Sequence, residues 1–105
     1  MMADLTIPKG DYGYDIIFTI QDADGNAYDL TGYTIKFKVW KSGSSGTLFI
    51  NGACTIVKAV SGICKYLIVK GDFKAVDIYK FELELTKSGV VESIVSKELK
   101  VVESG

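Results

Sequence analysis

The sequence predicts an all-β protein in which two layers of antiparallel strands pack face to face. Ile and Val supply 21 of the 105 residues, against 13 for Leu and Ala together, and β-branched side chains favour a pleated sheet over a helix. The chain has eleven glycines, which lie at positions typical of turns. Apolar and polar residues alternate in several segments, and none keeps the 3.6-residue period of an amphipathic helix.

Two segments, residues 33–41 and 78–86, show the alternation most clearly. Each carries apolar side chains at every second position, which is typical of a strand with one buried and one solvated face. We therefore expect both strands to lie at the centre of the sandwich. The predicted core positions are Ile35, Phe37, Val39, Phe81, Leu83 and Leu85, with Tyr33 and Tyr79 on the same faces.

The remaining strands are shorter. Residues 14–20 repeat the alternation, and weaker runs predict strands at 4–7, 47–50, 54–58, 63–69, 90–95 and 97–102. Gly-containing turns at 22–26, 41–46, 61–62 and 87–89 separate them, since Gly adopts the positive φ that tight turns need. Residues 70–77 break the alternation and predict an irregular or helical turn.

Strands that recur every 8 to 12 residues in a chain of about 100 residues are typical of an immunoglobulin-like β-sandwich. We expect one such domain over residues 1–105. Antibody domains have the order Cys, Trp, Cys, whereas Trp40 precedes both cysteines here. We therefore expect the chain to resemble immunoglobulin domains in architecture only.

Composition excludes several classes of function. All twelve cationic residues are Lys, and the net charge is −1, so the chain lacks the basic field of a nucleic-acid-binding protein and the Arg side chains that read guanine. It has no His, which removes Ser/His/Asp triads, Cys/His dyads and His-ligated zinc. We expect no catalysis, no metal and no organic cofactor.

The chain carries no signal-like start and no run of about 18 apolar residues, so we expect neither export by a signal peptide nor a membrane span. The missing signal argues for a reducing cytoplasm, in which Cys54 and Cys64 stay thiols. If residues 61–62 form the turn of a hairpin, Cys54 faces a residue near Leu67 and Cys64 one near Val57. The two cysteines are then not directly opposite.

Three patterns resemble functional motifs but have simpler interpretations. Asp22, Asp24 and Asn26 open like a calcium loop, yet later positions of that loop lack its Gly and Glu, so a hairpin turn is favoured. Glu82 and Glu84 share one strand face, where Lys36 or Lys38 can form cross-strand ion pairs with them. The Gly-rich residues 42–47 lack a phosphate-loop ending and predict a hairpin loop.

Three aromatic residues are candidates for contact with a partner: Trp40, Tyr12 and Tyr14. Strict alternation places Trp40 on the solvated face with Lys36 and Lys38, where an exposed Trp often marks a binding surface. A bulge near the strand end that turns the indole inward is the alternative. Tyr12 and Tyr14 flank Gly13 and either cover one end of the sandwich or form a sugar-stacking platform.

The order of the segments resembles a known family. The runs ADLTIPKGD at 3–11, IFTIQDADG at 17–25 and DLTGYTIKFKV at 29–39 are similar to the N-terminal domain of phage baseplate upper proteins. The later runs INGACTIV at 50–57, SGICKY at 61–66 and YKFELEL at 79–85 agree in order and spacing. The resemblance spans nearly the whole chain and rests on this succession.

The resemblance implies a non-enzymatic immunoglobulin-like module of a tailed-phage or prophage virion, which attaches host-recognition components to the tail baseplate by protein contacts. Its implied partners are other tail or baseplate proteins, with homo-oligomers also possible, and neither nucleic acid nor membrane. Two alternatives remain open at this point. One is a carbohydrate-binding module that uses Trp40 and tyrosines, and the other is a bacterial surface adhesion or stalk domain.

Overall fold

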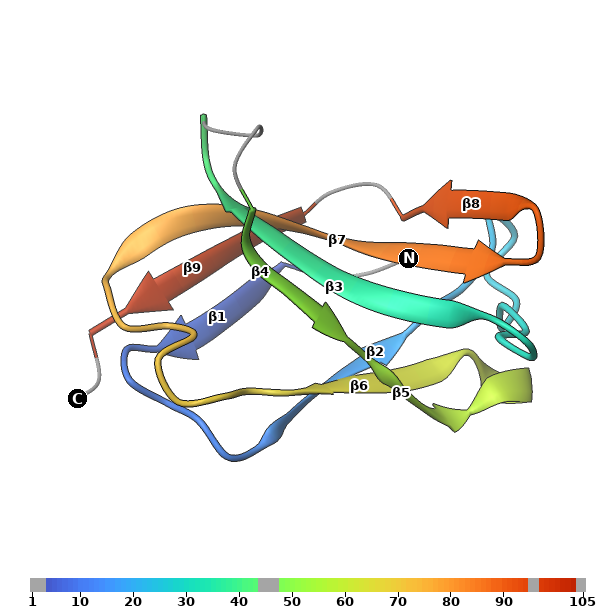
Figure 1. The fold of residues 1–105 in the computed structure, drawn as a ribbon, viewed down its shortest axis with the longest axis horizontal. Helices are drawn as coiled ribbons and strands as arrows, with labels where there is room; N and C mark the ends of the chain where they lie inside the picture. Colours follow the sequence, from blue (N-terminus) through green and yellow to red (C-terminus); the bar gives the residue numbers. More distant parts are fainter. Residues whose placement is uncertain (1–3, 44–47, 95–96, 104–105) are drawn as a thin grey trace.

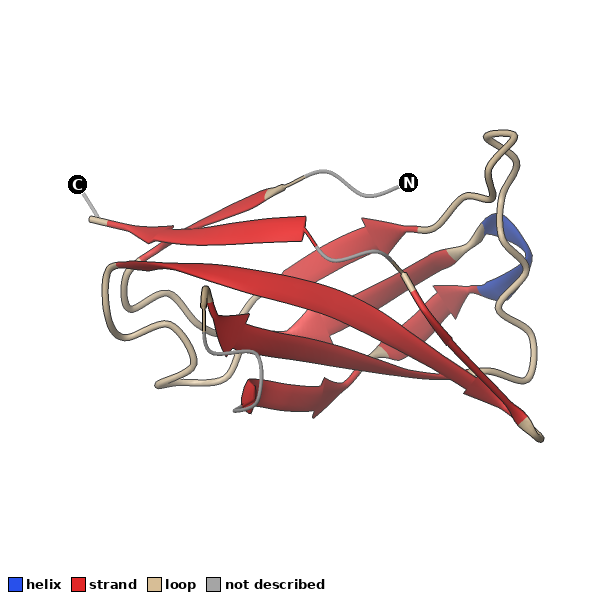
Figure 2. Ribbon diagram, turned by 90° about the horizontal axis from the view of Figure 1, so that it is seen from above, coloured by secondary structure: helices blue, strands red, loops and turns tan. Residues whose placement is uncertain are grey.

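The computed structural model describes residues 4–43, 48–94 and 97–103, which form two packed β-sheets (Figures 1 and 2). The larger sheet contains β1 (Leu5–Pro8), β9 (Lys97–Val102), β7 (Asp77–Lys87), β3 (Thr34–Lys41) and β4 (Leu48–Ala53) in this order, with β8 (Val90–Ser93) beside β7. The smaller sheet has the order β2 (Asp15–Thr19), β6 (Ile63–Leu67) and β5 (Thr55–Lys58). The all-β sandwich prediction is confirmed.

The central strands β3 and β7 pair along their length, as Figure 1 shows, with Ile35 opposite Leu85 and Phe37 opposite Leu83. The six core residues predicted from alternation are all buried, none more than 1% exposed. Phe37 packs against Phe81 and against Phe18 of β2 with ring centroids 5.8 and 5.5 Å apart, which ties the two sheets together. The assignment of these side chains to the buried faces of the two strands is confirmed.

One strand pair departs from the antiparallel pattern. β1 runs parallel to β9, with Leu5 beside Leu99 and Pro8 beside Val102. With β8 treated as an insertion, the smaller sheet matches strands B, E and D of an immunoglobulin domain, and β9, β7 and β3 match G, F and C. The fold is therefore immunoglobulin-like in strand order as well as in layering.

The chain changes sheets between β4 and β5. Cys54 lies between these strands, and its backbone N–H donates to the carbonyl of Ile35 in β3 at 2.8 Å. β5 then pairs with β6 in the other sheet. A single run of chain thus forms one edge of each sheet.

The loops differ from the sequence prediction in one place. Residues 70–76 form turns and bends, in agreement with the irregular turn expected there, whereas a short 3-10 helix occurs at Ala59–Ser61, where only a turn was expected. It ends at Gly62, which has a φ of 71° and donates its N–H to Ala59. Residues 44–47 of the Gly-rich loop and Val95 of the expected strand 90–95 lie outside the described residues.

Candidate functional site

Tyr12 and Tyr14 lie on the segment that leads into β2. Gly13 between them has a φ of 87° and donates its N–H to the carbonyl of Ile68, while Tyr14 accepts from the N–H of Ile68. Tyr12 is 52% exposed and Tyr14 is 44% exposed. The segment therefore presents two aromatic side chains to solvent from a backbone that is fixed on both sides of Gly13.

Each tyrosine has a charged neighbour. The Tyr14 hydroxyl donates to Oδ2 of Asp11 at 2.6 Å, and this hydrogen bond raises the pKa of the phenol. The Lys70 ammonium lies 5.9 Å from the centroid of the Tyr12 ring, within the range of a weak cation–π contact. This end of the sandwich thus combines aromatic surface with both signs of charge, a composition that suits protein contacts.

Trp40 lies on the outer face of the larger sheet. The register of β3 with β7 runs through it without a break, with Val39 opposite Phe81 and Trp40 opposite Lys80. The irregularity is in β4, where the pairing moves from Ile50 to Leu48 and leaves Phe49 as the extra residue. The alternative that a bulge turns the indole inward is therefore wrong, but Trp40 is half-buried rather than fully exposed.

The three predicted contact residues do not form one surface. Trp40 belongs to the larger sheet and pairs in register with Leu48 of β4, whereas Tyr12 and Tyr14 precede β2 of the smaller sheet. Among the described residues, no aromatic contact joins Trp40 to either tyrosine. The structure thus offers two separate aromatic surfaces.

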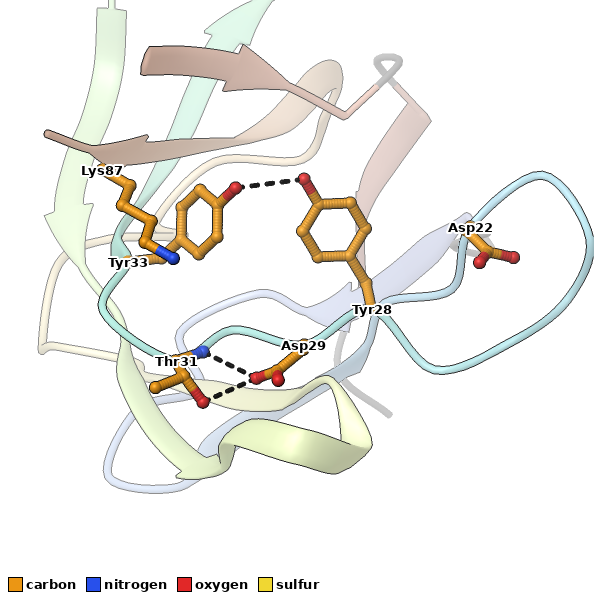
Figure 3. A pocket seen from close by; sticks show the side chains of 6 residues that line it. All are labelled: Asp22, Tyr28, Asp29, Thr31, Tyr33 and Lys87. Atoms are coloured by element: carbon orange, nitrogen blue, oxygen red, sulfur yellow. Dashed lines mark hydrogen bonds between the residues drawn. The ribbon is translucent and has the colours of Figure 1, made fainter. Parts of the chain in front are cut away.

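A surface hollow of about 340 Å³ lies near the opposite end of the sandwich (Figure 3). Tyr28 and Tyr33 form one side, with ring centroids 5.9 Å apart in an edge-to-face arrangement, and the Lys87 ammonium lies 5.2 Å from the Tyr33 centroid. Asp29 accepts from both the N–H and the hydroxyl of Thr31 at 2.9 and 2.6 Å. The lining residues are Asp22, Tyr28, Asp29, Thr31, Tyr33 and Lys87.

Hydrogen bonds set the electrostatics of this hollow. The Tyr28 hydroxyl donates to Oε2 of Glu92 at 2.5 Å and lies 3.4 Å from the Tyr33 hydroxyl, and these bonds raise the pKa of Tyr28. The bonds from Thr31, with the Lys87 charge as a smaller cause, lower the pKa of Asp29. At neutral pH the Tyr28 phenol is therefore neutral and the Asp29 carboxylate is ionised.

The acidic patterns singled out in the sequence have structural roles. Asp22 Oδ1 accepts from the N–H groups of Asp24 and Asn26 at 2.9 and 3.0 Å, which confirms the hairpin turn. Lys38 forms an ion pair with Glu84 at 2.7 Å, which confirms a cross-strand pair on this face. In the part of the chain that the structure describes, no three metal-ligating side chains cluster.

Cys54 and Cys64 are free thiols. Cys64 lies opposite Ile56, and the ladder shifts by one residue at Val57, so the partner predicted near Val57 is displaced by one position. Cys54 precedes Thr55, which faces Lys65, and the cysteines are diagonal rather than opposite, as predicted. A hydrogen bond to Cys64 and burial raise the pKa of the Cys54 thiol.

Sequence reasoning did not identify the hollow. Asp29-Leu-Thr31 is a local turn motif that could have indicated one wall, since Asp side chains accept from the backbone two residues on. Tyr33 was assigned to the buried face and is half-buried. The contacts of Tyr28 with Glu92 and of Lys87 with Tyr33 join residues far apart in sequence and leave no local pattern.

The strand order and the packed sheets define an immunoglobulin-like sandwich domain that carries exposed aromatic side chains. The chain belongs to the family of the BppU N-terminal domain, a phage baseplate upper protein family, which matches residues 4–103. The family indicates a structural role in a phage tail. No curated protein matched the chain. The described part of the chain contains no apolar helix of membrane-spanning length.

Proposed function

We propose that this domain is a non-enzymatic assembly module of a tailed-phage or prophage baseplate, which attaches host-recognition components to the tail by protein contacts. The observation that carries the proposal is the family match over residues 4–103. The chain also lacks His and Arg and has a net charge of −1, which argues against acid–base catalysis by His and against nucleic-acid binding. Its partners are other tail or baseplate proteins.

The end of the sandwich that carries Tyr12 and Tyr14 is the contact surface that we propose first. Both rings are exposed, and Gly13 holds the backbone between them against Ile68. Tyr side chains provide large contact area at a low cost in conformational entropy. Trp40 with Leu48 forms the second proposed surface, on the outer face of the larger sheet.

The test is co-purification of the chain with the tail proteins encoded beside it, comparing the parent with a Tyr12→Ala/Tyr14→Ala variant and with Trp40→Ala. Val91→Ala is the matched control, because Val91 is exposed on β8 and belongs to neither aromatic surface. We expect the control to bind like the parent and at least one aromatic variant to lose binding. Failure of the parent to bind any tail protein would contradict the proposal.

A carbohydrate-binding module is the second candidate, and the hollow at Tyr28 and Tyr33 favours it. Two phenols, a carboxylate and the Lys87 ammonium could hydrogen-bond the hydroxyls of a sugar. A glycan array with the parent, Tyr33→Ala and Trp40→Ala tests this function. Specific glycan binding that one of these variants loses, in a chain that binds no tail protein, would replace the assembly function with the carbohydrate one.

A further inference from the structure

The hollow beside β3 uses almost all of its side-chain hydrogens in bonds within the domain. The Tyr28 hydroxyl donates its only hydrogen to Glu92, so the bond between the two phenols takes its hydrogen from Tyr33. The Thr31 hydroxyl donates its hydrogen to the carboxylate two residues before it. Among the side chains that line the hollow in the described chain, Lys87 alone therefore keeps N–H groups for a ligand.

The hydrogen-bond acceptors of the hollow are only partly used. Asp29 accepts both bonds from Thr31 through Oδ1, and Asp22 accepts both of its turn bonds through Oδ1. No donor among the described residues bonds to the Oδ2 atom of either side chain. The Tyr33 oxygen also keeps its lone pairs, because it acts as the donor toward Tyr28. The hollow therefore suits a ligand that donates hydrogen bonds.

The charge of the hollow favours a cation among such donors. Two carboxylates, Asp22 and Asp29, line it against the single ammonium of Lys87. A third carboxylate, Glu92, bonds to the Tyr28 hydroxyl. Hydrogen bonds from its own turn lower the pKa of Asp29, so this carboxylate is ionised at neutral pH. The formal charge of the hollow is therefore negative, which attracts cations.

Lys87 shows that these walls hold a cation. Its ammonium lies 5.2 Å from the centroid of the Tyr33 ring, within the range of a cation–π contact. Its side chain passes over Gly32, where a Cβ would lie 3.2 Å from the Lys87 Cε atom. Figure 3 shows Tyr28 across the hollow from this ammonium, with Asp29 below. The aromatic and acidic walls thus already contact one cation of the chain itself.

We infer that the hollow receives an arginine side chain of another tail protein. A guanidinium has five N–H groups in one plane, so it can donate to several separated acceptors at once and stack on a phenol ring. The hydroxyls of a neutral sugar both donate and accept, and only Lys87 could donate to them. These 105 residues contain no Arg, so a second copy of the domain does not supply the guanidinium. The inference rests on the proposed attachment function for its partner, whereas the site is testable without that partner.

The site is tested on the chain alone, by NMR titration with the peptide acetyl-Gly-Arg-Gly-amide. The control peptide carries citrulline, which has nearly the shape of arginine without its charge. We expect the arginine peptide to shift the ring signals of Tyr28 and Tyr33, less strongly at high salt, and the citrulline peptide to leave them unchanged. Equal shifts with both peptides, or none with arginine, would overturn the inference.

Three variants locate the binding. Asp29→Asn keeps an acceptor for Thr31 but removes the charge, and it should weaken arginine binding about fivefold, the factor for an opposite charge about 4 Å away in water. Glu82→Gln makes the same chemical change on β7, outside the lining of the hollow, and should bind like the parent. Lys87→Met removes a like charge and should strengthen binding about threefold at low salt, as for a charge roughly 6 Å away.

Circular dichroism establishes that each variant is folded. Weaker arginine binding by Lys87→Met would overturn the inference, because Lys87 would then be a donor to the ligand. Equal effects of Asp29→Asn and Glu82→Gln would overturn it as well, because the peptide would then respond only to net charge.

Co-purification with the neighbouring tail proteins separates this inference from the proposed function. Asp29→Asn should lose binding that Glu82→Gln retains. Tail-protein binding that Asp29→Asn leaves unchanged would overturn the inference but not the attachment function. A parent that binds the arginine peptide but no tail protein would contradict the attachment function and still support a guanidinium site. Specific glycan binding that Asp29→Asn abolishes, without a response to arginine, would overturn the inference and assign the hollow to a sugar.

Discussion

The Tyr28 hydroxyl donates a 2.5 Å hydrogen bond to Glu92, a residue 64 positions further along the chain. This bond connects the loop before β3 to the strand β8, which otherwise pairs only with β7. It also forms one wall of the hollow at Tyr33. The position of β8 therefore depends on a side chain from the other half of the sequence.

Tyr28→Phe should destabilise the domain by about 1 kcal/mol, because it removes one partly exposed hydrogen bond to a charged group. Urea unfolding measures the change. Tyr14→Phe is the control: its hydroxyl bonds to Asp11 only three residues away on an exposed segment, so its loss should cost less than about 0.5 kcal/mol. Equal effects of the two variants would contradict the structural role of the Tyr28 bond.

The same bond predicts a dependence on alkaline pH. The pKa of Tyr28 is raised by the Glu92 bond first and the Tyr33 contact second. A raised pKa in the folded state contributes stability that is fully present below the unfolded value of about 10 and is lost as pH rises through the folded value. NMR of the Tyr28 Cζ carbon should still show a protonated phenol at pH 10. Half ionisation at that pH would contradict this prediction.

Phe81→Ala should cost about 3 to 5 kcal/mol of unfolding free energy, as measured by urea titration. Phe81 is fully buried and lies between Phe18 and Phe37, so truncation removes contacts to both sheets. Such a loss is a large part of the stability of a domain of this size. Thr34→Ala, at an exposed position on β3, is the control, and a Phe81→Ala variant that matches it would show that this site is not the core.

Gly62→Ala should destabilise the domain far more than Gly71→Ala. Both glycines have positive φ, 71° and 92°, so both variants incur the left-handed cost of about 1 to 2 kcal/mol. A Cβ at Gly62 would also collide with the backbone carbonyl of Ile20, whereas nothing lies within 4 Å of one at Gly71. Thermal unfolding of the two variants separates the clash from the backbone strain.

Freshly purified protein should have the mass of the fully reduced chain. Cys54 and Cys64 are free thiols that lie diagonally across the pairing of β5 with β6, and a reducing cytoplasm keeps such thiols reduced. Intact-mass measurement with and without a reductant tests this. A mass lower by the two hydrogens that a disulfide removes would contradict it.

The sequence alone predicted the strands and the core because their signal is local. In β3 and β7, alternate residues are buried almost without exception, and a period of two is visible in any short window. The parallel pairing of β1 with β9 was not predictable in this way, because it joins residues at the two ends of the chain. Nothing near Leu5 indicates that Leu99 is its neighbour.

The candidate sites, too, include features that have a local sequence signal and features that depend on contacts between distant residues. Tyr12 and Tyr14, which the sequence offered as contact candidates, are exposed, and the turn at Asp22 follows from its own residues. For Trp40 the alternation identified the correct sheet face but not the burial, which depends on neighbouring strands. The hollow needs Lys87 next to Tyr33, a contact set by the register of β3 with β7.

The parallel ladder of β1 and β9 has a mechanical consequence. Because the two strands run in the same direction, the start of β1 at Leu5 and the end of β9 at Val102 lie at opposite ends of the ladder. A force that pulls these points apart acts along the strands, so it shears all the hydrogen bonds of the ladder together rather than opening them one at a time. The domain is 37 Å long. Because its first and last strands form this ladder, it can carry tension in line with its long axis.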